Sequence, residues 1–132
     1  REIVEQDVTV IAAYQRTLED AAITKATALV LHDTDLFSTV IYARHYFSND
    51  ASEVLDSARE RRAHLYLLCD TDLPWQNEPL QRSKHSSQER AILTTAFKTL
   101  LKEEGCCVEV VRGIGASRLA SARAALKRHY PN

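Results

Sequence analysis

The fold is decided by the stretch Leu65-Tyr66-Leu67-Leu68-Cys69-Asp70-Thr71-Asp72-Leu73-Pro74-Trp75. Its first five residues form a near-continuous apolar run, which is typical of a parallel strand covered by helices on both faces. Acidic residues close the run, and a proline stiffens the exit from it. In an open parallel sheet the ligand crevice lies beyond the carboxyl ends of the strands, so the charge at this strand end predicts a small-molecule site.

An earlier stretch repeats this design, because the apolar run at 28–32 ends in Asp33-Thr34-Asp35. Alternate residues of a strand point the same way, so Asp33 and Asp35 are expected to converge on one ligand or one hydrated cation. Magnesium with a phosphate substrate suits them, since one or two carboxylates plus phosphate oxygens usually hold that ion. The alternative is that one of the two carboxylates caps a helix beginning at Leu36. Both interpretations can hold, each for a different residue.

Trp75 and the basic residues that follow it suggest ligand recognition. The indole could stack on a planar heteroaromatic ring, with cation–π attraction if that ring is positive. The alternative is a hydrophobic plug beneath the loop. Arg82, Lys84 and Arg90 could neutralise a transferring phosphoryl group if their loop closed over a nucleotide. As single residues, such cations are more often simply solvated.

Apolar spacing along the chain predicts alternating helices and strands. A helix is expected at about 2–26, with an apolar stripe of Val4, Val8, Ile11, Leu18 and Ala22 that Gln15 interrupts. Further helices are expected at 36–47, from Asp50 with Glu53 as capping-box partner, from about Ser87 to a C-cap at Gly105, and after Gly113 and Gly115. Strands are expected at roughly 28–33, 64–70 and 106–111. This order specifies a layered α/β fold with a parallel sheet.

Composition limits the class of protein. A chain of 132 residues with 45% hydrophobic content fits a single domain, and its formal charge of -1 gives no general field for nucleic acid or an anionic membrane. No apolar stretch approaches the roughly 20 residues of a membrane span, and no secretory signal opens the sequence. We therefore expect a cytoplasmic protein that makes no membrane contact. The three cysteines fit neither a disulfide framework nor a metal site, and we expect them to be reduced and mostly buried.

The chain resembles the ribosylnicotinamide kinase domain of the NadR type over most of its length. The residues that carry the resemblance are Arg1-Glu2-Ile3-Val4, Ile11 to Gln15, Asp33-Thr34-Asp35-Leu36, Thr39, Tyr42, Tyr66-Leu67-Leu68, Asp72-Leu73-Pro74-Trp75, Asn77-Glu78, Gly113 and Arg118. The resemblance implies a three-layer P-loop kinase fold. It also implies ATP-dependent phosphorylation of nicotinamide riboside to the mononucleotide in NAD salvage, with magnesium.

The resemblance also implies roles for single residues. Asp33 resembles the acid that handles magnesium in catalysis, and Asp35 the acid that contacts the ribose hydroxyls or accepts the proton. Trp75 would stack on nicotinamide, with Asp72, Gln15 and Glu2 also on the substrate side. Arg82 and Arg90 would be catalytic arginines of a lid loop at about 76–90. Gly113 and Arg118 would lie near the adenine of the nucleotide.

Two departures from the family pattern concern the nucleotide. The phosphate-binding loop G-x-x-x-x-G-K-[ST] is absent, because glycine occurs only at positions 105, 113 and 115. The family's Asp-Gly-Leu-Arg appears here as Glu78-Pro79-Leu80-Gln81, with Arg82 one place late. The strand leading into the missing loop would lie in mid-sheet, between the strands expected at 28–33 and 64–70. We therefore expect the parent chain to include an upstream strand, phosphate loop and helix, without which the 132 residues would be an inactive part of the domain.

Two other functions remain open. The first is a non-catalytic member of the fold that binds only a nucleotide or a protein partner. The second is a P-loop kinase or NTPase with a different acceptor, such as a nucleoside or a phosphorylated lipid or protein. Nucleic acid would be bound only through a domain outside this chain, and the sequence leaves the oligomeric state open.

Overall fold

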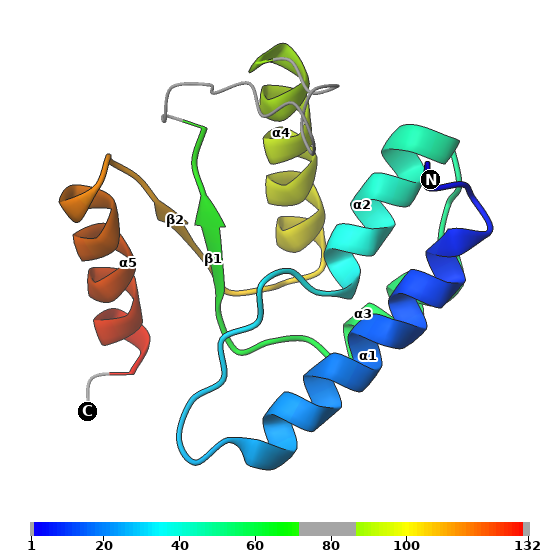
Figure 1. Cartoon of the computed structure of the whole chain (residues 1–132). Helices are drawn as coiled ribbons and strands as arrows, with labels where there is room; N and C mark the ends of the chain where they lie inside the picture. Colours follow the sequence, from blue (N-terminus) through cyan, green and yellow to red (C-terminus); the bar gives the residue numbers. More distant parts are fainter. Residues whose placement is uncertain (1, 72–86, 131–132) are drawn as a thin grey trace. The chain divides into compact units, whose positions relative to one another are not determined.

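The computed structural model describes residues 2–71 and 87–130, which divide into two compact units after Arg62 (Figure 1). The predicted site residues Asp72, Trp75 and Arg82, and most of the expected lid loop, lie outside the described residues. The lid was predicted to extend to residue 90, but residues 87–90 are helical. None of the described helices has the length and the apolar run that crossing a bilayer requires.

The first unit consists of three helices, with α2 at its centre. These are α1 (Asp7–Lys25), α2 (Leu36–Phe47) and α3 (Ser52–Glu60), and α2 contacts both of the others. The largest fully buried side chains, Leu36, Phe37 and Val40, all belong to α2. Burial of each such side chain contributes about 1.5–3 kcal/mol. The predicted helix at 36–47 is therefore confirmed, and it supplies the largest share of the apolar core of this unit.

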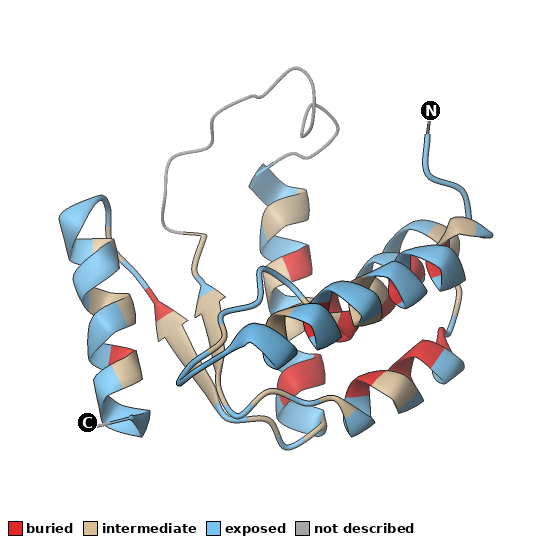
Figure 2. Ribbon diagram, turned by 60° about the horizontal axis from the view of Figure 1, so that its bottom comes forward, coloured by how far each residue is buried: buried red, intermediate tan, exposed pale blue. Residues whose placement is uncertain are grey.

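Helix α1 buries a different face from the one that the sequence predicted. It begins at Asp7, whose carboxylate accepts the Val4 N–H at 2.9 Å. Ile11 and Leu18, two residues of the predicted apolar stripe, are exposed, and the helix is exposed along most of its length (Figure 2). The buried positions are Val8, Ala12 and Glu19. The prediction holds at Val8 and is wrong after it, because the buried face continues one residue later, through Ala12 and Glu19, and so includes a carboxylate.

The buried Glu19 is held by a polar network that ties the end of α3 to α1. Its side chain is 5% exposed, and Arg61 Nε donates to Oε1 at 3.2 Å. Gln15 Nε2 donates to the other carboxylate oxygen, also at 3.2 Å. Arg61 further donates to Asp20 and to the Arg16 carbonyl, and its pKa is raised, chiefly by the bond to Asp20. A buried carboxylate is tolerated when it is paired and hydrogen-bonded in this way.

Replacing Glu19 with Gln should reduce the free energy of unfolding by about 1–2 kcal/mol, because the hydrogen bond from Arg61 loses its charged acceptor while Asp20 still pairs with the guanidinium. Urea denaturation followed by circular dichroism measures this loss. Glu60→Gln, an exposed substitution at the end of α3, is the matched control and should change stability by less than about 0.5 kcal/mol. Equal effects of the two substitutions would show that the network contributes nothing to stability.

The strand predicted at 28–33 does not form. Residues 26–35 contain no paired strand, and Leu29 and Leu31 are 50% and 72% exposed. A strand exists only when a second strand pairs with it, and the described residues give this segment none. The apolar run was therefore insufficient to predict a strand.

Short polar contacts set the starts of α2 and α3. Asp35 Oδ1 accepts the Phe37 N–H at 3.0 Å, so the capping interpretation of Asp35 is confirmed. The capping box predicted for Asp50 and Glu53 is wrong, since α3 starts at Ser52. There Asn49 Oδ1 accepts the Ala51 N–H at 2.8 Å, and Ala51 takes a left-handed conformation with φ +54°. A local side-chain turn thus replaces the expected helix cap.

The second unit is built on a parallel pair of strands. Strands β1 (Tyr66–Cys69) and β2 (Val108–Val111) pair in the register Tyr66 to Val108, and α4 (Ser87–Glu103) lies between them in the chain. The last helix, α5 (Ala116–His129), contacts β2 (Figure 1). The mixed α/β class and the parallel sheet are confirmed as a two-stranded sheet of the described residues. The three-layer arrangement with a central P-loop strand stays a prediction.

Helix α4 ends in the turn that the sequence predicted. Gly105 has φ +68°, its N–H donates to the Lys102 carbonyl at 3.0 Å, and the Cys106 N–H donates to the Leu101 carbonyl at 2.9 Å. This pair of bonds is a Schellman motif, which needs a left-handed residue and therefore favours glycine. The predicted C-cap at Gly105 is confirmed, and it directs the chain from α4 into β2.

Charged side chains join α5 to β2. Glu109, in β2, accepts from Arg128 Nη2 at 2.7 Å and lies 3.0 Å from His129 Nε2. These bonds, with Arg128 the stronger cause, lower the pKa of the Glu109 carboxyl from 4.5 to about 2. The folded unit therefore keeps Glu109 ionised in moderately acidic solution.

The lowered pKa of Glu109 predicts a loss of stability in acid. As the pH falls below about 4.5, the unfolded chain binds a proton at Glu109 while the folded chain does not, so the free energy of unfolding should decrease until about pH 2. Above that range the contribution of Glu109 is complete. Glu109→Gln should reduce this decrease, as measured by urea denaturation at a series of pH values, and the exposed Glu103→Gln should not. If the free energy of unfolding of Glu109→Gln fell in acid as much as that of the parent chain, Glu109 would not be the cause of the loss.

Candidate functional site

The carboxyl ends of β1 and β2 bring acidic and basic groups together. Asp70 follows β1 and Arg112 follows β2, and the Asp70 N–H donates to the Val111 carbonyl at 2.9 Å. The Asp70 carboxylate accepts the Thr71 N–H at 2.8 Å and Arg112 Nε at 3.1 Å. Asp70, Arg112, Gly113 and Arg118 are here called the carboxyl-edge cluster. Their position is the one at which open parallel sheets bind ligands.

In this cluster the hydrogen-bonded carboxylate of Asp70 lies beside the exposed guanidinium of Arg112. The Thr71 N–H, and secondly Arg112, lower the pKa of Asp70 from its ordinary value. The Arg112 side chain is 67% exposed, so its guanidinium can meet an anion from solution. Its backbone N–H donates to Ser121 Oγ on α5 at 3.2 Å, which fixes the start of the turn. Sequence reasoning missed Arg112, although its place directly after a strand was the available signal.

The structure brings the predicted residues Gly113 and Arg118 together. Arg118 Nη1 donates to the Gly113 carbonyl at 3.1 Å, and Nη2 donates to the Asp70 carbonyl at 2.8 Å. Gly113 has φ +99°, and a Cβ there would lie 2.5 Å from Ser117 Oγ. The glycine is therefore required by both its conformation and its space. Arg118 clamps the end of β1 to the turn after β2, which is a positioning task that the sequence did not reveal.

In the first unit, the structure places Gln15 against the segment that holds Asp33 and Asp35. Gln15 Nε2 lies 3.3 Å from the Thr34 carbonyl oxygen as well as bonding Glu19. Asp33 is exposed, and Thr34 is left-handed with φ +67°. The expected convergence of Asp33 and Asp35 rested on strand alternation, which this segment does not have. Their joint action on one ligand therefore stays a prediction.

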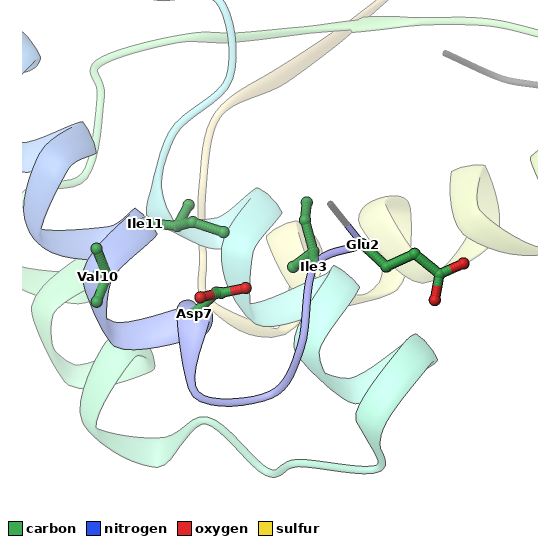
Figure 3. Close-up of a pocket in the computed structure, with 5 residues that line it drawn as sticks. All are labelled: Glu2, Ile3, Asp7, Val10 and Ile11. Atoms are coloured by element: carbon green, nitrogen blue, oxygen red, sulfur yellow. The ribbon is translucent and has the colours of Figure 1, made fainter. Parts of the chain in front are cut away.

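The structure describes Glu2 in the first unit and Arg90 in the second. Glu2 borders an open hollow of about 360 Å³ lined also by Ile3, Asp7, Val10 and Ile11. Figure 3 shows the Glu2 side chain extending away from Ile11 rather than toward it. Arg90 is half-buried in the first turn of α4. The predicted substrate role of Glu2 and the catalytic role of Arg90 stay predictions.

The side chains of the described residues do not enclose a metal ion by themselves. Residues 2–71 and 87–130 hold no group of three or more His, Cys, Asp or Glu side chains that could enclose a metal ion. Magnesium does not require such a cage, because it is often held by one or two carboxylates together with substrate phosphates and water. The exposed carboxylate of Asp33 fits this second mode, in which the phosphate oxygens come from the nucleotide.

Replacing Arg118 with Met should lower the free energy of unfolding by about 1–2 kcal/mol, because two carbonyl contacts of a charged donor are lost while the aliphatic stem is kept. Arg123→Met is the control, since Arg123 is exposed on the same helix. Urea denaturation of both variants measures the difference. The clamp would be refuted if both variants unfolded at the same urea concentration as the parent chain.

A protein-family model covers most of the chain. The model of a family described as AAA domain matches residues 2–118, a span that includes α1 to β2, Gly113 and Arg118. No curated protein and no solved structure matches the chain. Since the matched span is most of its length, the chain belongs to the AAA domain family, whose members are P-loop NTPase-like proteins.

Proposed function

We propose that the chain is part of an ATP-dependent small-molecule kinase whose acceptor is nicotinamide riboside. The observation that carries the proposal is the carboxyl-edge cluster at the end of a parallel strand pair in a chain of the AAA domain family. Ligands of open parallel sheets bind beyond this edge. The acceptor rests on the resemblance around Asp33-Thr34-Asp35 and Asp72-Leu73-Pro74-Trp75.

In this proposal the two carboxylates of the first unit have separate tasks. Asp33, which is exposed, would bind magnesium together with phosphate oxygens. Magnesium, when bound, neutralises the charge that develops on the transferring phosphoryl group. Asp35 would contact the ribose hydroxyls or accept the proton of the attacking hydroxyl. Capping α2 uses one acceptor position of Asp35, and an ionised carboxylate has about four.

Basic residues would bind the phosphate groups and shape the turn near the adenine ring. Arg112 presents an exposed guanidinium beside Asp70, and this charge suits a phosphate oxygen. Arg118 and Gly113 would shape the turn near adenine, with Arg118 acting through the carbonyls that it holds. Arg82 and Arg90 would stabilise the transferring phosphoryl group.

A second candidate is a non-catalytic member of the same family that binds only a nucleotide or a protein partner. One observation favours it: the 132 residues contain no G-x-x-x-x-G-K-[ST] motif, which supplies the backbone donors that cradle the phosphates. Isothermal titration of the whole encoded protein with ATP, followed by a turnover assay with nicotinamide riboside, separates the two functions. Turnover supports the kinase, and binding without turnover supports the second candidate. Absence of ATP binding contradicts the kinase and leaves the second candidate only as a protein-binding domain.

The proposed role of Asp33 predicts a magnesium-dependent loss of nucleotide affinity. Asp33→Asn should weaken binding of ATP with magnesium by about tenfold and leave binding of ATP with EDTA unchanged, because only the metal contact is removed. Isothermal titration measures both affinities. Asp56→Asn, which removes an exposed carboxylate on α3, is the control. An equal loss with and without magnesium would exclude Asp33 as the metal ligand.

The proposed role of Trp75 predicts a change in KM rather than in kcat. Trp75→Ala should raise KM for nicotinamide riboside by about tenfold, because stacking on a positive pyridinium ring is lost. Trp75→Phe keeps an aromatic face and should stay within about threefold of the parent protein. Steady-state kinetics with varied riboside measures both variants. An unchanged KM in Trp75→Ala would favour a kinase with a different acceptor.

A further inference from the structure

Three reactive side chains meet near the amino end of β2, outside the carboxyl-edge cluster. Cys107 precedes β2, Glu109 lies within it, and His129 is the last residue of α5. Cys107 Sγ lies 3.6 Å from His129 Nδ1 and 3.9 Å from Nε2. His129 Nε2 lies 3.0 Å from Glu109 Oε2. The three side chains therefore form a continuous chain from thiol to imidazole to carboxylate.

The carboxylate determines which imidazole nitrogen carries the proton. Glu109 is ionised, since its pKa is lowered to about 2, and an ionised carboxylate can only accept hydrogen bonds. In a neutral His129, Nε2 must therefore carry the hydrogen and donate it to Glu109. Nδ1 then presents its lone pair, and it is the ring nitrogen nearer to Cys107 Sγ. The similar distances from Sγ to the two nitrogens place the sulfur beside the ring, so this tautomer accepts the thiol proton at Nδ1 after the imidazole or the thiol turns.

The surroundings of Cys107 favour a reactive thiol. A thiol reacts as its thiolate, which forms more readily when a base takes the proton and a cation lies close by. His129 supplies the base, and once it has taken the proton its imidazolium is the cation beside the sulfur. Cys107 is exposed, as is Cys69, so the expectation of mostly buried cysteines was wrong. Reagents in solution can reach the sulfur, in contrast to a cysteine in a hydrophobic core.

We propose that Cys107 is a site of reversible S-thiolation by small organic disulfides. The Cys107 thiol proton moves to His129 Nδ1, and the thiolate attacks one sulfur of the disulfide. A new S–S bond joins Cys107 to half of the reagent while the original S–S bond breaks. The departing thiolate takes the proton from the imidazolium and leaves as a thiol, so Cys107 is oxidised and the departing half is reduced. A free thiol reverses the reaction.

This modification is independent of the proposed kinase activity, because it uses none of the residues assigned to ATP or acceptor. Its location gives it a structural consequence. An adduct on Sγ would replace the contact of Cys107 with His129, and His129 also pairs with Glu109 where α5 meets β2. S-thiolation is therefore expected to loosen the last turn of α5.

Labelling of the whole protein with 2-hydroxyethyl disulfide near neutral pH tests the proposal. This reagent is small and uncharged, so attraction by Arg128 does not bias the result. Mass spectrometry with fragment ions follows the adduct on each cysteine over time, and dithiothreitol should remove it. Cys107 should react at least about tenfold faster than Cys69, which is also exposed but has no histidine contact among the described residues. Equal rates for Cys107 and Cys69 would overturn the proposal without the need for any variant.

Replacing His129, the proposed base, distinguishes a proton-accepting role from a purely structural one. His129→Gln should slow Cys107 to within about threefold of Cys69 and leave the Cys69 rate unchanged. Glu109→Gln should slow Cys107 less, because the imidazole remains but loses its ionised partner. His64→Gln, an exposed histidine of the same unit, is the control and should have no effect. If His129 had only a structural role, its loss would expose the sulfur further, and an unchanged or increased Cys107 rate in His129→Gln would refute the proposal.

Discussion

The parallel pairing of β1 with β2 is the constraint that organises the second unit. Parallel strands cannot be joined by a tight hairpin, so α4 lies between them in the chain. The same constraint puts both carboxyl ends at one edge of the sheet and both amino ends at the other. Asp70 and Arg112 therefore meet at one edge, while Cys107 lies at the opposite one. One unit thus carries two sets of side chains with different chemistry.

Arginine serves two distinct purposes in this protein. Arg118 and Arg61 direct their donors to carbonyls or carboxylates within their own unit, and they hold neighbouring segments in place. Arg112 keeps most of its side chain in solvent although it also pairs with Asp70. The planar guanidinium has five N–H donors, so a structural contact does not exhaust its capacity to bind an anion. Exposure, rather than residue type, distinguishes the arginine that can meet a ligand.

Sequence reasoning succeeded where structure depends on neighbours in the chain. Periodicity predicted α2, α4, β1 and β2, and local chemistry predicted the Gly105 cap and the capping role of Asp35. It failed where the outcome depends on distant residues. The run at 28–33 needs a partner strand, and the burial of Glu19 needs Arg61, 42 positions away. For the same reason the clamp made by Arg118 and the thiol–imidazole contact of Cys107 could not be predicted.

The contact between Glu19 and Arg61 joins the first helix of its unit to the residue just beyond the last one. It closes a long loop of chain whose interior contains α2 and its buried core. Ordering that loop costs conformational entropy, and only the complete set of contacts in the unit offsets this cost. The helices should therefore not unfold one at a time. Amide hydrogens in α1 and α3 should accordingly exchange with solvent through a shared opening event, so that these two helices behave as one cooperative element.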